Sequence, residues 1–202
     1  SNLAGSIDIR WPTWITLKRV MGYADDIQDA EVILAQVKNI EKQRQLLEEP
    51  DLILPLVANL TQLLREELNR LEKEYQYRHN KGMVRLKADT SWQQLDPEQR
   101  NSLLAEQKLT LSDAPEINVA GTEEIVATLE QITLSALTDR VAAMLSRFDG
   151  VLVGATELME PEAQFVKLPS RTIKTEQDID DWLNDAKSQI QKALKRGSVI
   201  IH

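Results

Sequence analysis

Three clusters of carboxylates are the residues of this sequence with the clearest capacity for chemistry. They are Asp25–Asp26, Glu123–Glu124 and the segment from Glu176 to Asp181, in which four of six residues are acidic. Clustered carboxylate oxygens can hold a hard cation, and neighbouring carboxyl groups can divide acid and base roles. Carboxylates are also favoured in the first turn of a helix, where they interact with its dipole. Because each cluster stands where a helix is predicted to begin, we interpret all three as helix starts.

Other catalytic groups lack the partners that their chemistry requires. His79 lies in a charged helical segment, and His202 is the last residue. The absence of cysteine excludes disulfides and thiolate metal sites, and neither HExxH nor GxSxG occurs. The segment Gly150–Gly154, GVLVG, lacks the spacing and the lysine of a phosphate-binding loop. We predict no catalytic residue, cofactor-binding residue or metal ligand.

Two further features could contact a partner. Trp92 lies in a polar segment between predicted helices, which makes it a candidate for partner contact. A basic strip near the C-terminus is a candidate nucleic-acid contact, through Lys187, Lys192, Lys195 and Arg196, with Lys167, Arg171 and Lys174 upstream. The alternative is that cations near a helix end complement its dipole.

Composition restricts the class of protein. The net charge of −8 disfavours direct DNA binding, which requires Lys and Arg to neutralise phosphates. Hydrophobic residues make up 42% of the chain, which is enough for a buried hydrophobic core. Aromatic residues make up only 4%, and this balance favours helices over strands. No apolar run approaches the roughly 20 residues of a membrane span, and no signal peptide opens the chain. These features suit a cytoplasmic protein, and the initial serine suggests that further sequence lies upstream.

The first half of the chain predicts helices of increasing length. One begins at Pro12, a residue tolerated in a first turn, and ends near Gly22. A second is capped by Asp25 or Asp26 and ends before Pro50. The strongest periodicity runs from Leu52 or Pro55 to about Lys87, with a possible break at Gly82. Its apolar seam consists of Leu56, Leu60, Leu64, Leu68, Leu71 and Tyr75, and charged residues fill the opposite face.

A second long helix is predicted after an insertion at about 88–121. Within the insertion, Asp96, Pro97 and Gln99 form a capping box for a short helix. The second long helix spans 122–159, crosses Gly150 and Gly154, and ends before Pro161. A helix ending at Gly150 and followed by a short strand is the alternative. Two long helices with complementary seams predict an antiparallel helical hairpin that resembles a coiled coil.

The last forty residues have a different pattern. Residues 164–168 and 198–201 are predicted strands, and 175–196 is an amphipathic helix that begins with a capping box formed by Thr175 and Asp178. Strand, helix and strand together predict a small β-α-β unit. The fold class is therefore mainly α with a small C-terminal α/β element. The predicted divisions are 1–50, 51–161 and 162–202.

Several segments together resemble a known family. They are LILPLVANLTQLLREELNR (52–70), WQQLDPEQRNSLLAEQKL (92–109), GTEEIVATL (121–129) and LPSRTIKTEQDIDDWL (168–183). In order and spacing they resemble the C-terminal region of the P-loop ATPases of bacterial BREX phage-defence systems (BrxC/PglY-like). The resemblance covers most of the chain, but it includes no catalytic motif.

The resemblance implies a function for the whole protein and a narrower one for this region. ATP and Mg²⁺ would bind to an ATPase part upstream, and the family restricts phage together with a methyltransferase and other BREX proteins. We therefore expect a non-catalytic assembly or partner-docking module in the bacterial cytoplasm, with other BREX proteins or a second copy as partners. The alternative is a nucleic-acid-contacting arm of the same complex.

Overall fold

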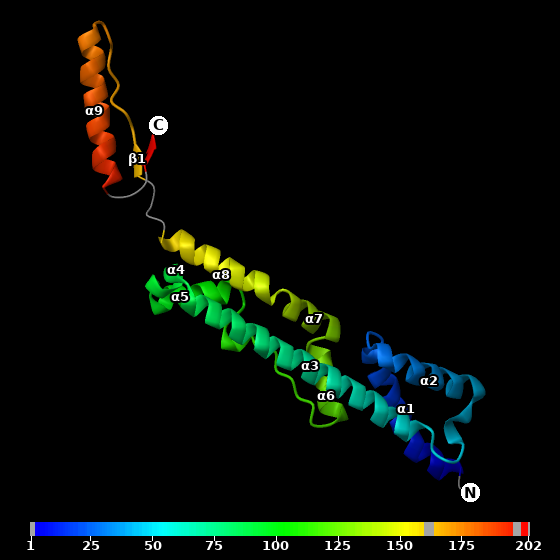
Figure 1. Ribbon diagram of the computed structural model, residues 1–202. Helices are drawn as coiled ribbons and strands as arrows, with labels where there is room; N and C mark the ends of the chain where they lie inside the picture. Colours follow the sequence, from blue (N-terminus) through cyan, green and yellow to red (C-terminus); the bar gives the residue numbers. More distant parts are fainter. Residues whose placement is uncertain (1–2, 160–163, 196–198, 202) are drawn as a thin grey trace.

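The structure is a computed structural model that describes residues 3–159, 164–195 and 199–201. Its described part is mainly helical, with two short strands near the C-terminus (Figure 1). The elements are α1 (Leu3–Ala24), η1 (Gln28–Ala30), α2 (Glu31–Gln43), η2 (Gln45–Leu47), α3 (Ile53–Ala88), α4 (Thr90–Gln94), α5 (Pro97–Glu106), η3 (Leu111–Asp113), α6 (Thr122–Gln131), α7 (Leu134–Ala142), α8 (Met144–Met159), β1 (Gln164–Val166), α9 (Glu176–Leu194) and β2 (Val199–Ile201).

Helix α3 is the axis of the fold, and its prediction from leucine spacing is confirmed. It runs for 36 residues without a break at Gly82. The seam residues Leu60, Leu64 and Leu68 are fully buried. The opposite face is solvated, and there Arg70 donates hydrogen bonds to carboxylates one turn away on the same helix. Burial of one seam, rather than helix propensity alone, accounts for the length of α3.

The two N-terminal helices, α1 and α2, begin at other residues than predicted. Helix α1 begins at Leu3, so Pro12 lies inside it and not in its first turn. Packing compensates for the hydrogen bond that proline removes, because the apolar face of α1 is fully buried at Leu17 and Val20. Helix α2 begins at Glu31, after the 3₁₀ turn η1. The prediction that Asp25 or Asp26 caps α2 is therefore wrong.

The predicted second long helix is divided into α6, α7 and α8. The chain leaves the helical conformation at Ile132, and the Thr133 side chain then accepts a hydrogen bond from the Ala136 amide (3.2 Å). This cap starts a new helix where the prediction placed a helix interior. Helix α8 does continue through Gly150 and Gly154, as expected, so the alternative of a strand after Gly150 is wrong.

The predicted antiparallel hairpin is also wrong, because α6–α8 run parallel to α3. Contacts advance in the same direction along both segments: Thr61 meets Thr122, Arg78 donates to the Val141 carbonyl, and Arg85 pairs with Asp149. The cause is the extended segment 114–120, which returns beside α3 before α6 begins (Figure 1). Arg65 on α3 anchors this return through a hydrogen bond from Nε to the Val119 carbonyl (3.0 Å).

Two buried apolar clusters lie along α3. The first joins the N-terminal half of α3 to α1, α2, α6 and the start of α7. The second joins its C-terminal half to α4, α5 and α8. Glycines allow close approach in the second cluster. A Cβ at Gly154 would lie 2.6 Å from Leu103 Cδ2, and one at Gly150 would lie 3.0 Å from the Gln107 amide. Gly154 and Gly150 thus make room for Leu103 and Gln107, which are likewise four residues apart at the end of α5.

The C-terminal unit contains β1, α9 and β2. The two strands pair in parallel, with Gln164 opposite Val199 and Val166 opposite Ile201. Each strand has only three residues, so α9 contributes most of the unit. Trp182 on α9 donates from Nε1 to the Pro169 carbonyl (2.6 Å) and thereby ties the helix to the extended chain that precedes it.

The capping box predicted at the start of α9 is confirmed. The Asp178 amide donates to Thr175 Oγ1 (3.2 Å), and Asp178 Oδ2 accepts from the amides of Lys174 (2.9 Å) and Thr175 (2.8 Å). These donors, led by the Lys174 amide and followed by the Thr175 hydroxyl and amide, lower the pKa of Asp178 below its ordinary value. The acidic segment that opens α9 is thus a folding signal.

Acid should therefore weaken the start of α9. A lowered pKa in the folded state contributes stability above the unfolded value, and this is lost as the pH falls through the folded pKa. We expect an NMR titration of the Asp178 carboxyl to give a pKa below 3.8. The variant Asp178→Asn should lose this acid-dependent fraying of α9, whereas Glu176→Gln should retain it. A normal pKa for Asp178 would contradict the capping geometry.

Candidate functional site: an apolar groove with a basic rim

The three acidic clusters lie at helix starts or in a turn, where they have structural roles. Glu176 and Asp178 occupy the first turn of α9, and Glu123 and Glu124 occupy that of α6, as expected. Glu123 also pairs with Arg19 on α1 (3.1 Å), which raises the pKa of that guanidinium. Asp25–Asp26 lies in the turn after α1. Within the described residues, no group of three His, Asp or Glu side chains is placed to hold a metal ion.

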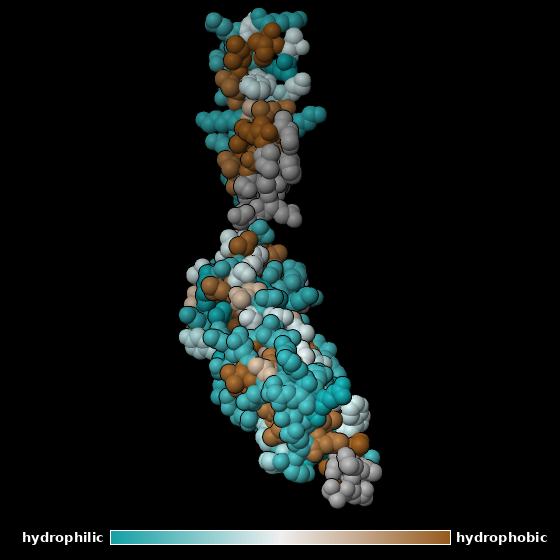
Figure 2. Space-filling view, turned by 90° about the vertical axis from the view of Figure 1, so that its right-hand side faces the viewer, coloured by the Kyte–Doolittle hydropathy of each residue, from teal (hydrophilic) through white to brown (hydrophobic). Residues whose placement is uncertain are grey.

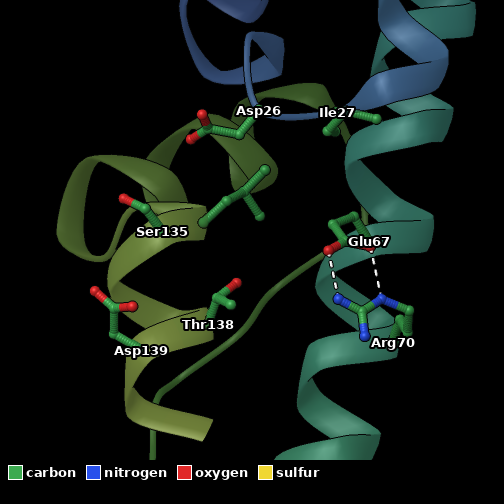
Figure 3. A pocket seen from close by; sticks show the side chains of 8 residues that line it. Asp26, Ile27, Glu67, Arg70, Ser135, Thr138 and Asp139 are labelled. Carbon is green, nitrogen blue, oxygen red and sulfur yellow. Dashed lines mark hydrogen bonds and ion pairs between the residues drawn. The ribbon is translucent and has the colours of Figure 1, made fainter. Parts of the chain in front are cut away.

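A polar pocket of about 360 Å³ lies where the turn after α1 meets α3 and α7 (Figure 3). Asp26, Ser135 and Asp139 line one side, and Glu67 with Arg70 lines the other. The Arg70 guanidinium makes a forked pair with Glu67 (2.7 and 2.8 Å), which lowers the pKa of that carboxyl. Because Arg70 is also paired with Glu74, its donors are largely used within α3. The pocket therefore offers little to an anionic ligand.

The histidine in the described part of the chain is structural. His79 stacks on Tyr75, with ring centroids 6.1 Å apart, and meets the edge of Phe148 at 5.6 Å. Its Nε2 lies 3.0 Å from the Leu109 carbonyl, a distance that fits a hydrogen bond from an Nε2–H tautomer. His79 thus joins α3 to the insertion and to α8. His202 lies outside the described residues.

Trp92 belongs to the core, so the prediction that it contacts a partner is wrong. Its side chain is only 5% exposed, and Arg100 covers its ring at 5.7 Å. The Asp89 carboxylate accepts from the Trp92 amide (2.9 Å) and starts α4, which turns the indole toward α8. The sequence around Trp92 gives no sign of this burial, because α4 has only five residues and Trp92 is its one buried residue. A single buried residue produces no apolar periodicity.

The basic strip lies on the C-terminal half of α9 and beyond. Lys187, Lys192 and Lys195 are exposed, and Lys192 falls in the last helical turn, as the dipole interpretation expects. Arg196 lies outside the described residues. Lys167, Arg171 and Lys174 are exposed in the extended chain before α9, where Arg171 approaches Asp181 at 3.9 Å.

An apolar groove of about 630 Å³ lies between α3 and α8, and we call it the α3–α8 groove. Gly82 and Phe148 form its floor, and Phe148 is 1% exposed. Large apolar side chains on its walls are open to solvent: Tyr77 is 66% exposed, Val84 68% and Leu145 63%. Soluble proteins seldom expose several large apolar side chains side by side. This surface is therefore a candidate for contact with another protein segment.

Cations occupy the rim of the α3–α8 groove. Arg78, Lys81 and Arg85 follow one another at steps of three and four along α3, and so lie on one face. Arg78 is paired with Glu74 (2.6 Å), and Arg85 is paired with Asp149. Lys81 is exposed, and no carboxylate of the described chain pairs with it. The rim therefore carries an excess of positive charge on a protein that is acidic as a whole.

Helix α9 presents a second apolar surface, the α9 stripe. The sequence predicts burial of this face, but Ile179 is 46% exposed and Leu183 is 51% exposed. The strands and the preceding chain cover the adjoining face, where Ala186 is 6% exposed. Figure 2 shows hydrophobic side chains gathered on the surface of this unit. The predicted amphipathic helix is confirmed, but its apolar face exceeds what the small unit can cover.

Comparisons with known proteins add no relative. No family model, curated protein or solved structure matches the chain. In the described residues, no helix combines the length and the apolar character that crossing a bilayer requires. The α3–α8 groove and the α9 stripe are therefore the features of the described residues that bear most directly on function.

Proposed function

We propose that this chain is a non-catalytic assembly module that docks other proteins, and that it forms the C-terminal region of a BREX anti-phage ATPase. The observation that supports docking is the pair of exposed apolar surfaces, the α3–α8 groove and the α9 stripe. Solvent exposure of such surfaces is unfavourable, and a partner that covers them gains the free energy of burial.

In this proposal the catalytic residues belong to another part of the same protein. ATP and Mg²⁺ would be bound by an ATPase part upstream, in the bacterial cytoplasm. This region would link that part to the methyltransferase or to other BREX proteins. The sequence supports this division, because it contains no phosphate-binding loop and no nucleophile–base pair, whereas long helices with exposed apolar faces are suited to assembly.

Co-purification with BREX proteins tests the proposal. The tagged chain is co-expressed with each other protein of a BREX locus, and we expect at least one stable complex. Phage restriction should be lost when residues 1–202 are deleted from the gene that encodes them. Restriction that survives this deletion, together with capture of no BREX protein, would overturn the proposed function.

A second candidate is a nucleic-acid-contacting arm, which the exposed lysines at the end of α9 favour. A gel-shift titration at low salt separates this function from docking. Nucleic-acid contact predicts salt-sensitive binding that is lost when Lys187, Lys192 and Lys195 are all replaced by glutamate. The net charge of −8 argues against it, and absence of binding at low salt would remove this alternative.

A further inference from the structure

We infer that the α3–α8 groove binds the α9 stripe of a second copy of this chain. The inference rests on the proposed assembly function and deepens it by naming the partner. Both surfaces are exposed and apolar, and the groove follows α3 from Tyr77 to Ala88. Eleven helical steps correspond to about 16 Å, which is long enough to seat three turns of another helix. An amphipathic helix placed in a groove is a recurrent mode of recognition.

Both surfaces carry large apolar side chains that are open to solvent. Ile179 and Leu183 stand one turn apart on α9 and are each about half exposed. The groove offers Tyr77, Val84 and Leu145 on its walls, and these side chains are also largely exposed. Docking would remove all five side chains from water. At about 25 cal/mol per Å² of apolar surface, such burial is the main gain of helix-in-groove contacts.

The charged parts of the two surfaces also match. Glu176 and Asp180 stand one turn apart on α9 and lie beside Ile179 and Leu183 in the helical repeat. In the described residues, neither carboxylate is paired with a cation. On the groove, Lys81 and Arg85 also stand one turn apart, and Lys81 has no described partner. In the proposed contact, the cations Lys81 and Arg85 of one copy face the carboxylates of Glu176 and Asp180 of the other. The apolar side chains of the two surfaces meet beside these charges.

A second copy, rather than the same chain, fits this arrangement. Figure 1 shows α9 beyond the end of α8 and away from α3, whose residues from Tyr77 to Ala88 line the groove, so α9 does not cover the groove of its own chain. Each copy has one groove and one stripe. Two copies that exchange α9 would therefore fill both grooves and satisfy two-fold symmetry, with every contact made twice. This doubling also enlarges the interface toward the size of a stable dimer.

Charge exchange tests the contact in solution. The chain and its variants are examined by analytical ultracentrifugation from about 1 to 100 µM, with circular dichroism to confirm folding. We expect a dimer for the unchanged chain. Lys81→Glu and Asp180→Lys should each weaken dimerisation at least tenfold, because each places like charges in both copies of the contact. Matched changes away from the contact, Lys38→Glu on α2 and Asp185→Lys on the opposite face of α9, should leave it within a factor of three.

Mixing the two variants is the decisive step. A heterodimer of Lys81→Glu with Asp180→Lys contains one native pair and one exchanged pair, so it should form with nearly the affinity of the unchanged dimer. A chain that is monomeric at 100 µM would overturn the inference, as would a dimer indifferent to both changes. A monomer that still captures a BREX protein would refute this contact while leaving the proposed function standing.

Discussion

Replacing Phe148 with alanine is expected to lower the free energy of unfolding by about 3–5 kcal/mol, the range for truncating a buried aromatic residue. Phe148 is 1% exposed and lies between Gly82 and His79 on α3. A Cβ at Gly82 would overlap the phenyl ring. Gly82→Ala should therefore destabilise the chain by about 1–3 kcal/mol, despite the better helix propensity of alanine.

The two changes should be strongly coupled. In the Phe148→Ala background the ring is absent, so Gly82→Ala should become neutral or stabilising by up to about 1 kcal/mol. Gly22→Ala in α1 is the matched control, because open space surrounds a Cβ there and alanine should stabilise the helix. Urea denaturation of the two single variants and the double variant measures the coupling. Simple additivity would contradict the packing of α8 on Gly82.

Arg10 is expected to be the most sensitive charged residue for stability. It is 6% exposed, and its guanidinium donates to the carbonyls of Leu46 (3.3 Å) and Glu48 (2.6 Å) and to the Glu49 carboxylate. These bonds fasten the turn after α2 to α1. Arg10→Met retains much of the side-chain volume but leaves carbonyl groups without a donor. The expected loss is about 3 kcal/mol, since hydrogen bonds to charged groups are the stronger ones.

Two further variants identify the origin of this effect. Arg10→Lys keeps the charge but cannot reach several acceptors at once, so an intermediate loss is expected. Arg19→Met removes an exposed arginine with two surface ion pairs and should cost much less. Thermal or urea unfolding ranks the three variants. If Arg10→Met were no worse than Arg19→Met, the buried fastening of the turn would not contribute to stability.

Local sequence signals predicted the helices whose ends carry capping chemistry. The box at Asp96 and Gln99 and the box at Thr175 and Asp178 are both present, and the leucine seam gave α3 nearly to its last residue. These signals work because cap and seam depend on residues within one or two turns. The break before Thr133 escaped prediction, since threonine also occurs inside helices and the apolar phase continues past it.

The relative direction of the long elements could not be read from periodicity. A seam on α3 and a seam on 122–159 pack equally well in either sense. The choice is made by the segment 114–120, held by Arg65, and extended backbone of this kind has no repeating pattern. The groove was missed for a related reason. Tyr77 and Val84 lie off the seam among charged residues, and they gain significance only once α8 lies beside them.

The parallel path has a consequence for biosynthesis. The contacts of α3 with the later helices join residues 61, 63 and 64 positions apart, at Thr61–Thr122, Arg78–Val141 and Arg85–Asp149. A ribosome therefore completes α3 long before it makes the helices that cover its C-terminal half. Such non-local pairing slows folding and exposes apolar surface to chaperones in the meantime. We expect nascent chains ending near Ala88 to bind a hydrophobic dye more strongly than chains extended beyond Met159 do.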